Sequence, residues 1–93
     1  MQFELFISPV AFAESMDAYD FYETKSIDLG ERFLNSLEST HQKIAHFPRR
    51  YTYISSTKDL KDVKVKDFPF VVIFQILNNK IIILRVFNTN RKP

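Results

Sequence analysis

The stretch FVVIFQILNNKIIILRVF, residues 70–87, decides the fold of this 93-residue chain. Residues 70–77 are apolar on both faces of an extended chain, which is typical of a central strand. Asn78 and Asn79 suit a tight turn because asparagine tolerates a positive φ angle. Residues 81–87 then form a return strand. We therefore predict an antiparallel β-hairpin at the centre of a sheet.

A first strand and a first helix are predicted upstream of this hairpin. Residues 2–8 alternate in polarity, as in a strand with one clearly apolar face. Ser8 supplies a hydroxyl that can cap a helix, and Pro9 suits the first helical position. The helix should end near Lys25. We expect its buried stripe to consist of the residues at helical spacing, which are Phe12, Met16, Tyr19 and Tyr22.

A second helix is predicted to begin after Asp28. Asp28 and Glu31 have the spacing of a capping box, and Pro48 ends the helix. The short link between the two helices implies an antiparallel helical hairpin. The core side of this helix is expected to carry Phe33, Leu37, Ile44 and Phe47, with Leu34 beside them.

A further strand precedes the central hairpin and completes the sheet. Val63 and Val65 alternate with Asp62, Lys64 and Lys66, which predicts a strand with one basic face. The order β-α-α-β-β-β therefore predicts one α+β domain over residues 1–93. Its four-stranded antiparallel sheet should carry the helical hairpin on one face only.

The second face of this sheet should then be apolar and uncovered. Such a patch usually marks a partner site, and we predict that a partner protein contacts Val71, Ile73, Ile82 and Leu84. The alternative is that the segment 48–59 covers this face within the monomer.

Composition and charge narrow the function. The chain has no cysteine, which excludes disulfides and thiolate metal sites and fits a reducing cytoplasm. No apolar run approaches the roughly 20 residues that span a membrane. Residues 1–47 carry three basic and eight acidic side chains, net −5, whereas residues 48–93 carry ten basic and three acidic, net +7. The basic half predicts an anionic partner, either nucleic acid or an acidic protein segment. The alternative is an ordinary solvated surface.

Four segments together resemble the RelE/ParE superfamily of toxins of type II toxin–antitoxin systems. They are Ser8-Pro9-x-Ala11 before DAYDFYE, then LGERFLNSLE, then IAHFPRRY, then the tail from VKDFPF to Pro93. The resemblance implies the fold predicted above, with sheet order 1-4-3-2. It implies a toxin held inactive by a cognate antitoxin whose disordered segment folds on it. RelE-like members cut mRNA on the ribosome, and ParE-like members inhibit DNA gyrase.

The resemblance also implies candidate catalytic residues, with no metal and no cofactor. If the chain is an enzyme, it is a metal-independent endoribonuclease. Lys64 and Lys66 then match the two strand lysines of RelE-like nucleases, and Arg91 matches a basic residue after the last strand. Val71 stands at the position of the central-strand arginine, Asn88 stands where many relatives have histidine, and no C-terminal tyrosine is present. We therefore predict a ParE-like growth inhibitor that is not an efficient ribonuclease.

Two other functions stay open, as do other roles for the basic residues. The alternatives are a RelE-like ribosome-dependent mRNA endonuclease and a non-toxic module that only binds antitoxin. Lys64 and Lys66 could merely protect an edge strand, and Arg85 could pair with a helix carboxylate. His41 and His46 have poor spacing for a metal. The predicted target-binding residues are Arg49, Arg50, Lys64, Lys66, Arg85 and Arg91.

Overall fold

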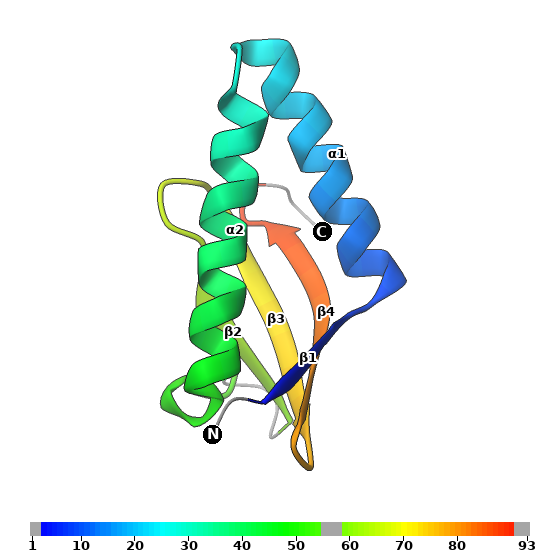
Figure 1. The fold of residues 1–93 in the computed structure, drawn as a ribbon, viewed down its shortest axis with the longest axis vertical. Coiled ribbons are helices and arrows are strands. Elements are labelled where there is room, and N and C mark those ends of the chain that lie inside the picture. The colour runs from blue at the N-terminus through cyan, green and yellow to red at the C-terminus, as the bar shows by residue number, and fades with distance from the viewer. Residues whose placement is uncertain (1–2, 55–58, 91–93) are drawn as a thin grey trace.

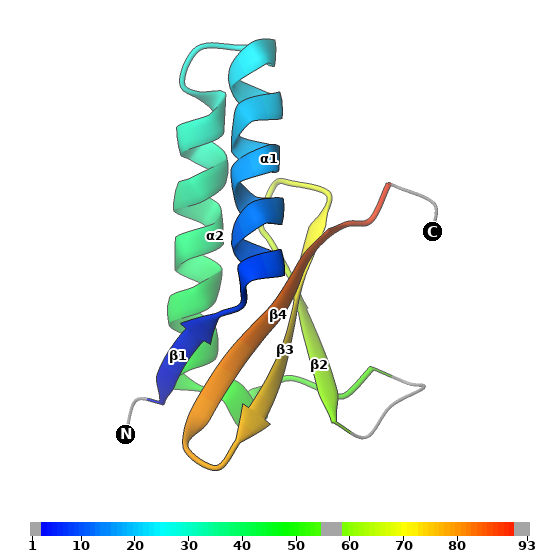
Figure 2. The ribbon, with the colours of Figure 1, turned by 90° about the vertical axis from the view of Figure 1, so that its right-hand side faces the viewer.

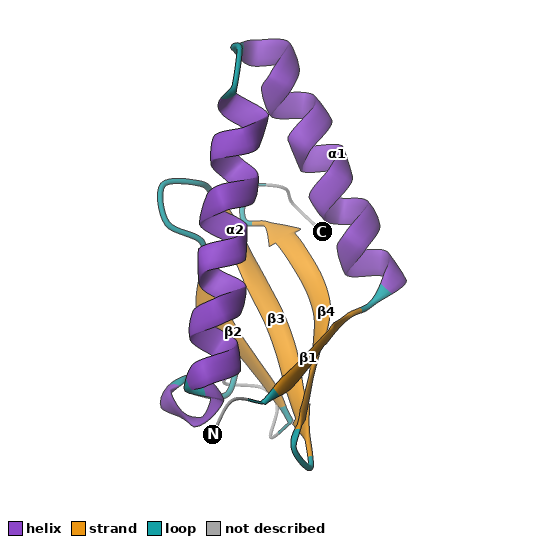
Figure 3. Ribbon diagram, in the orientation of Figure 1, coloured by secondary structure: helices purple, strands orange, loops and turns teal. Residues whose placement is uncertain are grey.

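The computed structural model describes residues 3–54 and 59–90 and shows an α+β fold (Figures 1 and 3). The sheet has the order β1-β4-β3-β2. Both the element order and the sheet order agree with the prediction. The elements are β1 (Glu4–Ile7), α1 (Pro9–Lys25), α2 (Leu29–His46), a 3-10 turn η1 (Pro48–Arg50), β2 (Leu60–Lys64), β3 (Phe70–Leu77) and β4 (Lys80–Asn88).

The sheet is mixed, so the prediction of a wholly antiparallel sheet was wrong. β2, β3 and β4 are antiparallel neighbours, but β1 pairs with β4 in parallel, with Leu5 beside Ile81. The helical hairpin returns the chain to the end of the sheet at which β1 begins (Figure 1). β2 and β4 therefore run in the same direction as β1. No tight turn joins β1 to β4, so local sequence does not fix their relative direction.

The core lies between the sheet and the two helices, which cover the same face (Figure 2). α2 contributes Phe33, Leu37 and Ile44, all buried as predicted. An aromatic cluster joins α1, α2 and β3, with ring centres 5.0–5.5 Å apart for the closer pairs. Its members are Tyr22, Phe33, Phe68 and Phe70. The remaining sheet side chains of the core are Val72, Phe74, Ile81, Ile83 and Val86.

The predicted buried stripe of α1 was wrong. Phe12 is 59% exposed and Met16 is 36% exposed, and only the Tyr22 end of the stripe joins the core cluster. The buried residues of α1 are small: Ala11, Ser15 and Ala18. Small side chains allow α1 to approach its neighbours closely, and the larger apolar side chains point outward as a result.

The helix ends show one correct and one wrong cap prediction. The Ser8 hydroxyl accepts a hydrogen bond from the Ala11 N–H at 3.1 Å and donates to the Leu84 carbonyl at 3.1 Å. Asp28 forms no capping box, because its φ of 67° and ψ of 3° turn the chain between the helices and its side chain makes no cap. Phe47 is 56% exposed, contrary to prediction, because α2 ends at His46 and Phe47 has left the helical conformation.

The described part of the segment 48–59 does not cover the second face of the sheet. Tyr53 forms an isolated bridge with Lys61, so this part runs along the edge of β2. Tyr51 packs edge-on against Phe74 on the core side, with ring centres 6.1 Å apart. The second face therefore keeps its apolar side chains partly exposed.

Candidate functional site: a cationic groove and an uncovered sheet face

A basic cavity of about 390 Å³ lies between α2 and β2. We call it the cationic groove. Among the described residues, four cations and no carboxylate line it. Cations without their own carboxylates create a positive potential that attracts an anion. The lining residues are Ser36, Ser39, Thr40, Lys43, Arg50, Tyr51, Val63, Lys64 and Lys66.

Lys64 and Lys66 both line the groove, although not as neighbours on one strand face. β2 ends at Lys64, and Val65 is buried with its N–H donating to the Phe70 carbonyl at 2.9 Å. Lys66 lies in the turn that follows, where Asp67 adopts a φ of 70°. The expectation of a longer strand was wrong, because the chain turns into β3 earlier than the Val-Lys alternation indicates.

Arg50 belongs to the cationic groove, but Arg49 does not. The Arg50 guanidinium lies 4.7 Å from the centre of the Phe47 ring, a cation–π contact that orients it. The Arg49 guanidinium instead lies 5.5 Å from the centre of the Phe3 ring. Sequence reasoning missed Lys43, because only the fold brings the last turn of α2 next to β2.

Lys61 is a second basic residue that sequence reasoning missed. It is only 5% exposed, and its ammonium lies 4.7 Å from the centre of the Tyr53 ring. Burial lowers the Lys61 pKa, and the charge of Arg49 lowers it further. The signal was present in the sequence, since Lys61 continues the alternation of Val63 and Val65 on the inward face of β2.

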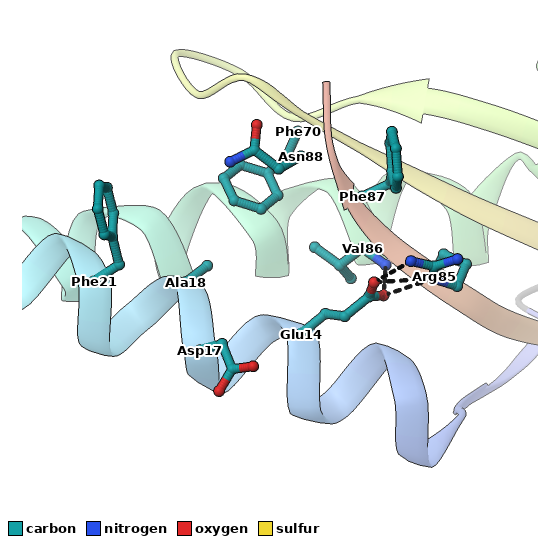
Figure 4. A pocket seen from close by; sticks show the side chains of 9 residues that line it. All are labelled: Glu14, Asp17, Ala18, Phe21, Phe70, Arg85, Val86, Phe87 and Asn88. Atoms are coloured by element: carbon teal, nitrogen blue, oxygen red, sulfur yellow. Dashed lines mark hydrogen bonds and ion pairs between the residues drawn. The ribbon is translucent and has the colours of Figure 1, made fainter. Parts of the chain in front are cut away.

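Arg85 pairs with a carboxylate of α1, as the alternative interpretation predicted. Its Nε donates to both carboxylate oxygens of Glu14 at 2.9–3.0 Å (Figure 4). Glu14 Oε1 also accepts the Val86 N–H at 2.9 Å. The hydrogen bond to Glu14 and its charge raise the pKa of Arg85. Glu14 thereby occupies the edge of β4 beyond the four residues that pair with β1.

The Glu14–Arg85 pair lines a separate cavity of about 250 Å³ between α1 and β4. Phe21, Phe87 and Asn88 also line it (Figure 4). Arg85 therefore does not join the cationic groove. Arg91, the remaining predicted target-binding residue, lies outside the described part of the chain.

The uncovered face of the sheet carries the predicted partner-contact residues. Val71, Ile73, Ile82 and Leu84 are each partly exposed, and together with Phe6 we call them the outer sheet face. Phe6 pairs in register with Ile82 and is 41% exposed, which extends the face onto β1. Sequence reasoning placed Phe6 on the polar side of the first strand and did not use it.

Comparison with known proteins identifies the family to which the chain belongs and a solved structure with a similar fold. The family described as "ParE toxin of type II toxin-antitoxin system, parDE" matches residues 5–93. The chain belongs to this ParE toxin family. A solved structure titled "Chromosomal ParDE TA system from P. aeruginosa" has a similar fold, with a TM-score of 0.71 and 17% identity. The similarity covers 96% of this chain and 98% of that one. No curated protein matches the sequence.

The described residues at the positions that the resemblance assigned to a RelE-like site do not all lie at the cationic groove. Val71, at the position predicted for arginine, pairs in register with Lys64, and both project to the outer side of the sheet. Asn88 lines the cavity between α1 and β4 instead of the cationic groove. Around the cationic groove, Tyr51 is the one described side chain with a titratable hydroxyl, and no histidine lines it.

Within the described residues, neither histidine belongs to a group of side chains that could hold a metal ion. His41 is buried in α2, and its Nε2 has no hydrogen-bond partner in the part of the chain that the structure describes. Burial lowers the His41 pKa, and Glu38 opposes this shift. His46 is exposed. Residues 3–54 and 59–90 contain no group of three metal-ligating side chains, and none of their helices is long and apolar enough to cross a membrane.

Proposed function

We propose that this ParE toxin inhibits growth and is neutralised by a cognate antitoxin that covers the outer sheet face. The supporting observation is that both helices lie on the opposite face, so Val71, Ile73, Ile82 and Leu84 lack a covering layer from the described chain (Figure 2). Removing apolar surface from water stabilises a complex by about 25 cal/mol per Å². An apolar antitoxin segment laid across β3 and β4 gains this contribution.

We propose further that inhibition works by occupying a target, in the manner of ParE-like toxins, with DNA gyrase as the first target to test. Two features favour this over ribosome-dependent mRNA cleavage. Val71 replaces the central-strand arginine, and the described lining of the cationic groove offers no histidine for proton transfer. Each general acid or base typically contributes about 10²–10⁴-fold to a rate, so a nuclease without these groups would be slow.

The RelE-like endonuclease is the second candidate, and one observation favours it. Lys64, Lys66 and the Tyr51 hydroxyl line one cavity. A phosphate bound there would meet two cations and one proton donor. A gyrase supercoiling assay and a toeprint on purified ribosomes separate the two candidates, because each toxin class inhibits only its own target.

Growth after induction tests the proposed function. Expression of the wild-type chain should arrest growth, and co-expression of the antitoxin from the neighbouring reading frame should restore it. Ile73→Asp places a charge on the outer sheet face, so this variant should arrest growth but escape neutralisation. Asn35→Asp, at an exposed position of α2, is the matched control and should be neutralised normally. Unimpaired growth with soluble, folded wild-type chain would instead indicate a non-toxic antitoxin-binding module.

A further inference from the structure

We propose that Lys61 is a nucleophilic lysine that accepts an acyl group from a small acyl phosphate. The proposal goes beyond the proposed function, because Lys61 lies outside both the cationic groove and the outer sheet face. Its first support is the place of this side chain in β2. Lys61 pairs in register with the buried Phe74, so it projects to the core side of the sheet and is only 5% exposed. Lys64 and Lys80 are exposed.

The buried ammonium of Lys61 has no carboxylate within ion-pair distance in the described chain. Its Nζ lies 4.7 Å from the centre of the Tyr53 ring, and the positive charge of Arg49 acts on it as well. Asp59 lines the same cavity, yet no ion pair joins it to Lys61. Burial and a neighbouring cation both favour the uncharged amine over the ammonium.

A cavity of about 100 Å³ gives a small molecule access to this amine. It lies between the start of β2 and the end of β3. The lining residues from β3 carry no charge. The full lining is Tyr53, Asp59, Lys61, Gln75, Ile76 and Leu77. Ordinary ligand pockets measure about 300–1,000 Å³, so this cavity admits a short acyl chain and excludes a bulky one.

An acyl transfer to this amine conserves atoms and electrons without any further reactant. The lone pair of the neutral Lys61 Nζ attacks the carbonyl carbon of the acyl phosphate, and an N–C bond forms. The C–O bond to phosphate then breaks, and its electron pair leaves with the phosphate group. The phosphate takes up the proton that the amine loses. The products are an uncharged amide at Lys61 and free inorganic phosphate.

Two features of the surroundings activate the amine and favour this donor. Burial lowers the Lys61 pKa, and the charge of Arg49 lowers it further. Lysines that are desolvated or placed beside another cation become activated nucleophiles. The exposed Arg49 also attracts the negative charge of an acyl phosphate. A neutral acyl donor gains no such attraction.

Site-resolved acetylation of the folded chain tests the proposal. The chain is incubated with acetyl phosphate, quenched and digested, and mass spectrometry gives the acetylation rate of each lysine. Near pH 7, Lys61 should react several-fold faster than Lys64 and Lys80, because each unit by which a lysine pKa falls raises its neutral fraction about tenfold. Above a pH of about 10.4, ordinary lysines are neutral as well, so this advantage should disappear.

Variants separate the contribution of Arg49 from general surface charge. Arg49→Gln should slow the acetylation of Lys61 near pH 7 and shift its pH profile upward, while Lys64 reacts as before. Arg32→Gln removes the same charge at an exposed position of α2, so this matched control should leave the rate of Lys61 unchanged. Lys61→Arg keeps the positive charge and removes the amine, so the fast phase of total acetylation should vanish. Circular dichroism verifies that each variant is folded.

The proposal is overturned if Lys61 reacts no faster than Lys64 and Lys80 in the folded chain near pH 7. It is also overturned if Lys61 keeps its advantage after the chain is unfolded in urea, since local sequence instead of the fold would then cause it. An unchanged Lys61 rate and pH profile in Arg49→Gln would likewise contradict it. Growth arrest and neutralisation by antitoxin are measured separately, so the proposed function can fail without this proposal, and this proposal without the proposed function.

Discussion

α1 and α2 lie against the same sheet, yet they bury opposite kinds of residue. α2 buries the large side chains Phe33, Leu37 and Ile44, as its sequence pattern predicts. α1 buries Ala11, Ser15 and Ala18 and exposes Phe12 and Met16. An apolar stripe thus identifies the buried side of a helix that faces a sheet broadly. It fails for a helix that approaches its neighbours closely, where small residues permit contact and large ones turn outward.

Among the tests of this comparison, truncating one phenylalanine on each helix should give the largest change in stability. Phe33 is fully buried and contacts the rings of Tyr22, Phe68 and Phe70, so Phe33→Ala should lower the free energy of unfolding by about 3–5 kcal/mol. Phe12→Ala should change it by less than about 0.5 kcal/mol. Chemical denaturation measures both. If Phe12→Ala instead lowered the free energy of unfolding by more than about 2 kcal/mol, Phe12 would be buried as the sequence pattern predicted.

The close approach of the two helices predicts a counterintuitive effect at Gly30. Alanine normally stabilises a helix relative to glycine by about 1 kcal/mol. Here a Cβ at Gly30 would lie 2.7 Å from the backbone oxygen of Tyr19, which cannot rotate away. Gly30→Ala should therefore destabilise the fold by about 1–3 kcal/mol in thermal or denaturant unfolding. Asn35→Ala, at an exposed site of α2, is the control. A stabilised Gly30→Ala variant would mean that the helices are further apart.

The contact of α1 with the edge of β4 should contribute less. Glu14→Ala removes the partner of Arg85 and the acceptor of the Val86 N–H, and should cost roughly 1 kcal/mol of unfolding free energy. Glu14→Gln keeps an acceptor for Val86 and loses the charge. It should cost no more than about 0.5 kcal/mol, since the Arg85 side chain is 45% exposed. Equal losses for both variants would assign the whole effect to the ion pair.

His41 should give the smallest effect, visible only on acidification. Burial lowers the His41 pKa in the folded chain, whereas the unfolded value is about 6.5. The unfolded chain therefore binds the proton first. The stability that His41 contributes is complete above pH 6.5 or so and is lost as the pH falls toward the folded pKa. His41→Leu should flatten the pH dependence of the melting temperature in this window. If the pH dependence of the melting temperature were unchanged in His41→Leu, another titratable group would be responsible for it.

Local patterns predicted those parts of the fold that local forces determine. The run 70–87 formed the β3–β4 hairpin with Asn78 at a φ of 59°, and Ser8 capped α1. The parallel pairing of β1 was not predictable in this way, because no turn links β1 to β4. The prediction at Asp28 was wrong because aspartate is a preferred N-cap residue and is also one of the few residues that adopt the left-handed conformation.

The candidate sites show the same difference between residues that local sequence predicts and residues that only the fold brings together. The outer sheet face followed from strand alternation, and Lys64 and Lys66 followed from the resemblance. Lys43, Ser36 and Ser39 were out of reach, because they join the cationic groove only when α2 folds back along β2. Arg49 and Arg85 were among the predicted target-binding residues. Their contacts with Phe3 and Glu14 instead remove them from the groove.

The binding of the antitoxin to a variant of the outer sheet face tests the central claim most directly. Ile73 is partly exposed and lies beside Arg85 in the sheet register. Isothermal titration calorimetry of folded Ile73→Asp with the antitoxin should show affinity reduced at least tenfold, or about 1.4 kcal/mol, while Asn35→Asp binds as the wild type does. Unchanged affinity for Ile73→Asp would contradict the account and place the antitoxin on another surface.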